Sequence, residues 1–202
     1  MIPARARTFA TFAFAAAAAT WLGFLTFVLF LVFRGAFGPV NDASGVLLAS
    51  VQIPVVIGVH QLLRNSSPRW SIVAATLGVI GSAMGVIGLG SLLLKSLIPW
   101  DFPEPYAGAG AYGLGILGPG VGGLWQVLVA LITLASGGLG KRVGWLCLLA
   151  GLGYVLVTSG FTTGGVSSPI GSIGGVLALI TGPLWLIGLG RKFRSIAQNA
   201  GA

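Results

Sequence analysis

The sequence predicts an all-α integral membrane protein with six transmembrane helices and no soluble domain. Of the 202 residues, 55% are hydrophobic and only 7% are charged, and the apolar residues fall into six long runs. This composition lies outside the range of soluble globular proteins. Because the connections between the runs are short, we expect neighbouring helices to pack as antiparallel hairpins.

The charged residues predict the topology. Nine of the eleven basic residues lie at the chain ends or in alternate connections: Arg5, Arg7, Arg64, Arg69, Lys141, Arg142, Arg191, Lys192 and Arg194. The other connections hold the remaining two and all three acids: Arg34, Lys95, Asp42, Asp101 and Glu104. Basic residues are enriched in cytoplasmic loops. We therefore predict a multi-pass protein of the bacterial cytoplasmic membrane with both termini in the cytoplasm.

Each run can be tested against the length of about 20 helical residues that a bilayer core requires. The predicted spans are residues 11–33, 44–63, 71–94, 115–136, 144–160 and 170–190. The first begins with an Ala-rich stretch that is typical of a signal peptide. Its apolar character continues to Phe33, well past the h-region of a signal peptide, so we predict an uncleaved span.

The later spans carry their own start and stop signals. The third begins after Pro68-Arg69-Trp70 and ends at Lys95, and the sixth ends at Arg191. The fourth opens with a Gly118-Pro119-Gly120 break, and the fifth is short, with Trp145 at its inner edge. Between the third and fourth spans, the external segment 96–113 carries aromatic and proline residues. We expect it to form a loop on the membrane surface that serves either as a partner contact or as an outer lid.

Glycine spacing predicts how the helices pack. The chain has 34 glycines, and two spans place small residues along one helix stripe: Ala74, Gly78, Gly81, Gly85 and Gly88, and then Gly171, Gly175, Ala178 and Gly182. Such stripes let helix backbones approach closely in a membrane. We predict helix packing here, within the chain or in an oligomer. The alternative is that a stripe lines a cavity for a flat ligand such as a pigment or quinone.

Three polar residues within the spans are candidate functional groups. His60 is either a structural residue at a helix end or an axial ligand to the metal of a haem or chlorophyll-type pigment, with Gly58 giving a flat ring room. Gln52 and Gln126 lie in the outer halves of their spans. They either pair across helices or form a polar position for a transported solute.

Other functions lack the residues that they need. The three acids lie outside the predicted spans, and one His with one Cys cannot build a metal site. The basic residues form no continuous face for nucleic acid. We therefore expect no enzymatic activity, no metal and no nucleic acid. The sequence favours a non-catalytic subunit or scaffold of a membrane complex or homo-oligomer. Such a protein would contact partners, lipid or pigment through the glycine stripes and segment 96–113. The alternative is a small transporter or channel.

Overall fold

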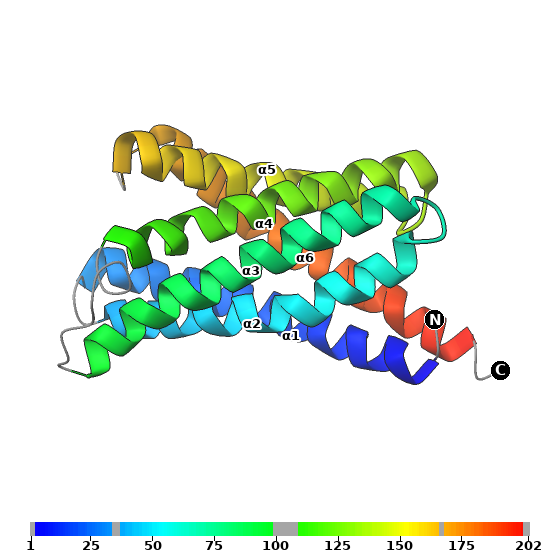
Figure 1. Cartoon of the computed structure of the whole chain (residues 1–202), viewed down its shortest axis with the longest axis horizontal. Helices are drawn as coiled ribbons and strands as arrows, with labels where there is room; N and C mark the ends of the chain where they lie inside the picture. Colours follow the sequence, from blue (N-terminus) through cyan, green and yellow to red (C-terminus); the bar gives the residue numbers. More distant parts are fainter. Residues whose placement is uncertain (1–2, 34–36, 99–108, 166–167, 200–202) are drawn as a thin grey trace.

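A computed structural model describes residues 3–33, 37–98, 109–165 and 168–199, and within these ranges it contains six long helices and no strand (Figure 1). The helices are α1 (Pro3–Phe33), α2 (Gly38–Leu63), α3 (Pro68–Leu97), α4 (Ala109–Ser136), α5 (Lys141–Gly164) and α6 (Pro169–Asn199). Each is long and apolar enough to cross a membrane. The chain is therefore a candidate multi-pass integral membrane protein, as the sequence predicts.

Proline and glycine set the helix ends. Pro39, Pro68 and Pro169 stand in the first turns of α2, α3 and α6. The fixed φ of proline suits this position, where its missing N–H costs no intrahelical hydrogen bond. The turn between α4 and α5 contains Gly137 and Gly140 with φ values of 74° and 93°. Side chains with a Cβ rarely adopt this left-handed conformation.

Each predicted span lies within one helix, but the helices extend beyond the apolar runs. α1 begins at Pro3, and α6 continues past Arg191 to Asn199. The predicted break at residues 118–120 is wrong, because α4 runs through Pro119 as a continuous helix. Proline has no backbone N–H, so the Gly115 carbonyl loses its helical donor. Thr158 of α5 donates a hydrogen bond to the next carbonyl, that of Ile116, at 3.0 Å, and so links α5 to α4 near the proline.

The six helices close into a ring. Each helix packs against its neighbours in sequence, and α6 returns to pack against α1. The indole rings of Trp125 in α4 and Trp185 in α6 meet inside the bundle with centroids 5.8 Å apart. Both side chains are almost fully buried, together with Val55 and Val59 of α2. The interior at this level is therefore filled with side chains.

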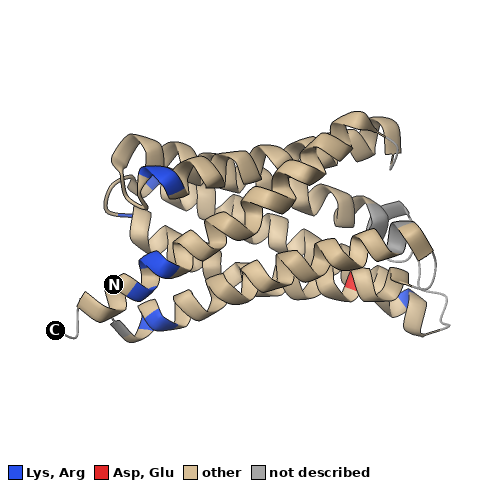
Figure 2. Cartoon of the chain, turned by 180° about the vertical axis from the view of Figure 1, so that it is seen from behind, with Lys and Arg blue, Asp and Glu red and all other residues tan. Residues whose placement is uncertain are grey.

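The two ends of the bundle differ in charge. Both termini lie at the same end (Figure 1), and most of the described Lys and Arg residues gather there (Figure 2), whereas Lys95 lies in the last turn of α3 at the other end. Asp42 is the only acid in the described ranges, and it lies near the start of α2, at the other end of the helix from Arg64. We predicted Asp42 outside the spans. It instead lies inside α2, because that helix begins at Gly38.

The glycine stripe of α3 packs within the chain. Its predicted members, Ala74, Gly78, Gly81, Gly85 and Gly88, are all buried. A Cβ added to Gly81 would lie 2.6 Å from the backbone nitrogen of Gly122 in α4, and one added to Gly118 would lie 2.8 Å from that of Gly85. The backbones of α3 and α4 are thus in direct contact, as the stripe predicts.

Three of the four small residues predicted on α6, namely Gly171, Ala178 and Gly182, are buried, and Gly174 is buried in addition. Gly171, Gly174 and Ala178 are buried against α5, where a Cβ on Gly153 would lie 2.6 Å from the nitrogen of Ala178. Gly175 is only half-buried, and a Cβ there would meet only Val157 of α5, at 4.0 Å.

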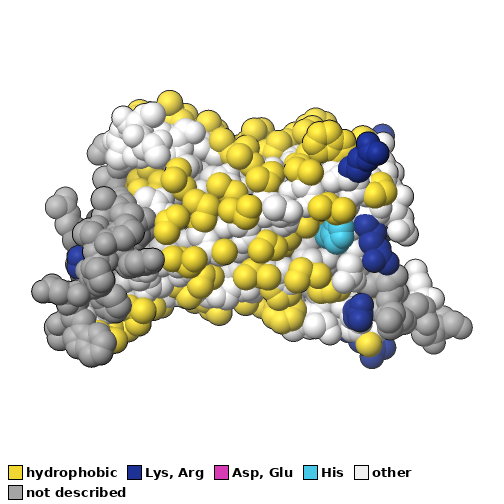
Figure 3. Space-filling model, in the orientation of Figure 1, with side chains coloured by type: hydrophobic (Ala, Val, Ile, Leu, Met, Phe, Trp, Pro, Cys, Tyr) yellow, Lys and Arg dark blue, Asp and Glu magenta, His cyan; other side chains and the backbone are white. Residues whose placement is uncertain are grey.

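The outside of the bundle is apolar. Hydrophobic side chains cover the middle of the face in Figure 3, between the basic end and the opposite end. Exposed examples are Ile72, Ile80, Leu131 and Ile173. A surface of this kind suits lipid contact. Trp100, Phe102 and Tyr106 of the predicted surface loop lie outside the described residues.

Candidate functional site

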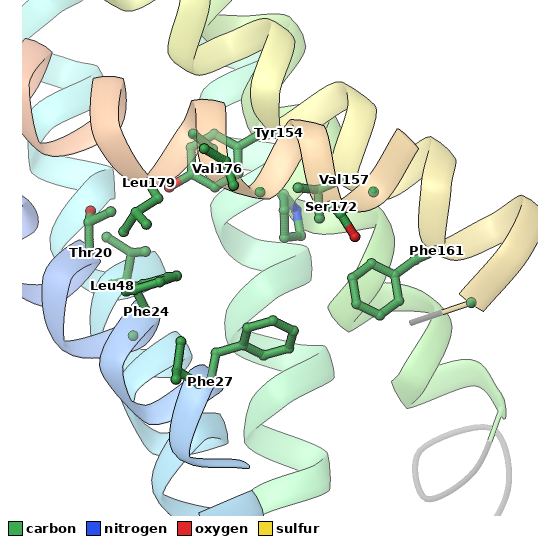
Figure 4. A pocket seen from close by; sticks show the side chains of 17 residues that line it. Thr20, Phe24, Phe27, Leu48, Tyr154, Val157, Phe161, Ser172, Val176 and Leu179 are labelled. Atoms are coloured by element: carbon green, nitrogen blue, oxygen red, sulfur yellow. The ribbon is translucent and has the colours of Figure 1, made fainter. Parts of the chain in front are cut away.

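An apolar cavity of about 400 Å³ lies between α1, α5 and α6, in the half of the bundle away from the termini. Its walls include Phe24 and Phe27 of α1, Phe161 of α5 and Leu179 of α6 (Figure 4). The volume lies within the range of about 300–1,000 Å³ that is usual for small-molecule sites. Val176, which also lines the cavity, is 57% exposed. The cavity therefore reaches the outer, apolar surface of the bundle.

The cavity forms because α1 and α6 separate along their length. Near mid-helix the two helices are still close, since a Cβ on Gly182 would lie 3.6 Å from the Cγ2 of Thr20. Two turns further from the termini, a Cβ on Gly175 would meet only Val157 of α5, at 4.0 Å. No α1 side chain covers Gly175 among the described residues. Gly175, which the sequence predicts as a packing residue, therefore borders the open space between α1 and α6.

A second, smaller cavity of about 130 Å³ lies between α2, α3 and α4. It is lined by the side chains of Gln52, Ser82 and Gln126, with Tyr154. The sequence singled out the two glutamines, and the structure brings them to the same cavity. No hydrogen bond between them is found among the described residues, so the predicted Gln52–Gln126 pairing is not seen.

The two cavities share Leu48, Pro119 and Tyr154 as lining residues. They are therefore adjacent, and together we call them the bipartite cavity, with an apolar arm toward α1 and α6 and a polar arm toward α2 and α3. None of the described residues that line either arm is charged. The arrangement suits a molecule with a long apolar part and an uncharged polar end.

Gln126 is the group in the polar arm with unused hydrogen-bonding capacity. Its side chain is 1% exposed, and its Oε1 has no hydrogen-bond partner among the described residues. Leaving a buried acceptor unsatisfied costs about 1–3 kcal/mol. Its backbone carbonyl is bonded, since the thiol of Cys147 donates to it at 3.2 Å. Gln126 is one of the residues that line the polar arm.

Tyr154 stands at the junction of the two arms, and the sequence analysis did not select it. Its phenol lies close to the side chain of Thr20 in α1. The Thr20 hydroxyl donates a hydrogen bond to the Ala16 carbonyl at 2.8 Å. A phenol in the middle of an apolar span was the available signal. Pro119 was selected as part of the Gly118-Pro119-Gly120 break, whereas Phe27 and Phe161 carried no signal, because aromatic residues are common in membrane helices.

His60 lies apart from the bipartite cavity, near the basic end of α2. The histidine, cyan in Figure 3, is visible on the outer surface. Its Nδ1 is nevertheless buried and has no hydrogen-bond partner in the described part of the chain. Gly58 does not provide room for a flat ring next to it, because a Cβ there would lie 2.8 Å from both Phe9 and Phe193. Ligation of a tetrapyrrole metal by His60 remains a prediction.

The comparisons add no relative. No protein family, no curated protein and no solved structure matches this chain. Within the described ranges, no three His, Cys, Asp or Glu residues lie close enough together to hold a metal ion.

Proposed function

We propose that this chain is a non-catalytic, multi-pass membrane protein that binds a neutral amphiphile in the bipartite cavity. The unpaired, buried Oε1 of Gln126 beside a largely apolar cavity carries the proposal. The apolar chain of the ligand would occupy the arm between α1 and α6, and a hydroxyl or amide group would donate to Gln126. The opening beside Val176 gives such a molecule a path from the bilayer.

The lack of charge in the cavity selects the class of ligand. Burying a carboxylate, phosphate or ammonium without a counter-charge costs far more than burying a hydroxyl. A fatty acid or phospholipid head is therefore disfavoured in the polar arm. Long-chain alcohols, quinols and isoprenoid alcohols combine an apolar body with a neutral hydrogen-bond donor, and they fit both arms.

The topology and the partners belong to the same proposal. We place the basic end in the cytoplasm of a bacterium, which follows the positive-inside rule and makes the six helices antiparallel neighbours. A role as a subunit of a complex would use the lipid-facing surface and segment 96–113. The α3 stripe is occupied inside the chain, so it is not free to contact a partner.

Transport is the second candidate, and the polar arm favours it. Gln52, Ser82 and Gln126 come from three helices and surround one cavity. Pro119 of the continuous helix α4 also lines this cavity. Proteoliposomes loaded with a small neutral solute such as glycerol test this candidate by solute release. Release no faster than from protein-free liposomes argues against transport.

The binding proposal is tested with 1-dodecanol, which has an apolar chain and a neutral donor. The midpoint of thermal unfolding is measured in mild detergent with dodecanol, dodecane or dodecanoate. We expect dodecanol to raise the midpoint, since a ligand at 100 times its Kd stabilises the folded state by about 2.7 kcal/mol. Equal shifts from all three compounds would show unspecific partitioning and contradict the proposal.

Gly175→Leu provides a variant that fills the apolar arm. Its new side chain would enter open space, since only Val157 lies within 4 Å of the Cβ position, so the fold is retained. We expect the dodecanol shift to disappear. Gly113→Leu is the matched control, because its Cβ meets nothing within 4 Å and it does not line either arm. A dodecanol shift unchanged in Gly175→Leu would contradict binding at this site.

A further inference from the structure

A third cavity lies at the basic end of the bundle, where α1 begins and α6 ends. Its volume is about 470 Å³, and it is separate from the bipartite cavity, with which it shares no lining residue. Arg7 and Thr11 of α1 line one side, and Arg194 and Gln198 of α6 line the other. Two arginines, one near each end of the chain, thus line the same cavity.

The cavity is kept open by small residues. Ala10 and Ala197 line it, and both are buried. On the α6 side, Phe14 packs against Gly190, where a Cβ would lie 2.9 Å from the ring. The guanidinium carbon of Arg194 lies 5.1 Å from the centroid of the same Phe14 ring. This cation–π contact restrains Arg194 at the cavity before any ligand binds.

The two arginines have no acidic partner in the described part of the chain. Asp42 is the only described acid, and it lies near the opposite end of the bundle. Two unpaired guanidinium groups recognise phosphate oxygens through paired, charge-assisted hydrogen bonds. The amide of Gln198 offers a further donor. The chemistry of the cavity therefore selects a phosphate group.

The position of the cavity selects a lipid as the source of the phosphate. Arg7 and Arg194 lie near the outer ends of two candidate membrane spans, which places them at headgroup depth. Toward the bilayer core, the exposed residues of the same two helices are apolar, including Leu184 and Trp21. Basic pockets between transmembrane helices on the cytoplasmic side are suited to anionic headgroups.

We infer that this cavity binds the headgroup of an anionic phospholipid from the leaflet at the termini end, with its phosphate between Arg7 and Arg194. The inference requires membrane insertion of the helices but not a ligand in the bipartite cavity. It also gives the contact between α1 and α6 a role, because a bound lipid would join the first and last helices of the ring.

Phosphatidylglycerol binding to the purified protein in mild detergent tests the inference. Lipid adducts are counted by native mass spectrometry, and the unfolding midpoint is followed as lipid is added. We expect phosphatidylglycerol to bind the double variant Arg7→Gln/Arg194→Gln about tenfold or more weakly than wild type, because charge-assisted hydrogen bonds are lost. The double variant Lys141→Gln/Arg142→Gln, which removes the same charge from residues outside the cavity, should bind like wild type.

Two further measurements distinguish lipid binding from the binding of free phosphate and from attraction to diffuse surface charge. Inorganic phosphate should not reproduce the stabilisation at equal concentration; if it does, the site is a free-phosphate site and the lipid inference is wrong. If the Lys141/Arg142 control loses as much affinity as the Arg7/Arg194 variant, the binding reflects diffuse surface charge, which also overturns it. Arg194→Lys guards against misfolding, since it keeps the charge, and its lost guanidinium fork should still weaken binding.

Discussion

The close contact between α3 and α4 requires a residue without a Cβ at position 81, so substitution of Gly81 should lower the stability of the bundle. An alanine there would place its Cβ 2.6 Å from the nitrogen of Gly122 and 3.0 Å from the oxygen of Gly118. Ordinary van der Waals contact begins at 3.4 Å, so the backbones must separate by about 0.8 Å. Both obstacles are backbone atoms, and no side-chain rotation can relieve them.

The cost of Gly81→Ala follows from two opposing effects. Overpacking costs about 1–3 kcal/mol, whereas replacing glycine by alanine within a helix contributes about 0.8–1.0 kcal/mol of stability. Gly90→Ala is the matched control in the same helix, because its Cβ meets only Val46 at 3.9 Å. Since the propensity gain is common to both variants, Gly81→Ala should be about 1–3 kcal/mol less stable than Gly90→Ala.

Unfolding in increasing fractions of SDS, from mild detergent, measures this difference. The fluorescence of the buried Trp125 and Trp185 reports the loss of the bundle interior. Gly81→Leu should lower the stability further, because a larger side chain requires a larger separation. Equal stabilities for Gly81→Ala and Gly90→Ala would refute the reasoning, since they would show that α3 and α4 do not touch through their backbones.

Two other substitutions distinguish structural from binding roles. Gln126→Leu removes an unpaired buried acceptor, so we expect the unliganded protein to be as stable as wild type or up to about 2 kcal/mol more stable. We also expect this variant to lose its stabilisation by dodecanol. Unfolding in SDS with and without dodecanol measures both effects, and a preserved stabilisation by dodecanol would contradict the role of Oε1. His60→Leu should change the free energy of unfolding by less than about 1 kcal/mol and leave the absorption spectrum unchanged; loss of a Soret or bacteriochlorophyll band would instead assign His60 as a metal ligand.

The sequence predicted the six helices because membrane insertion leaves a simple signal. Long apolar runs and alternating basic connections are visible without any knowledge of packing. The helix ends were less predictable. Backbone hydrogen bonding continues past the apolar boundary, so that Arg5 and Arg7 lie on α1 and the basic tail lies on α6.

The packing residues were predicted in part. The α3 stripe was recognisable from spacing alone, and it packs against α4. Gly175 was wrongly grouped with the α6 packing row, because the sequence does not show that α6 meets α5 and α1 on different faces. Gln52 and Gln126 could be selected as unusual, but the cavity that they share could not. A cavity arises from the distance between helices, and no single residue encodes it.

The proposed binding site is tested most directly by identifying the small molecule that co-purifies with the protein from its own membrane. We would purify the tagged wild type and Gly175→Leu from the native host in mild detergent, and analyse the organic extract by mass spectrometry and absorption. We expect a neutral amphiphile to co-purify with wild type in near-stoichiometric amount and to be absent from the extract of Gly175→Leu. An extract that contains no such molecule, or the same amount from both proteins, would contradict it.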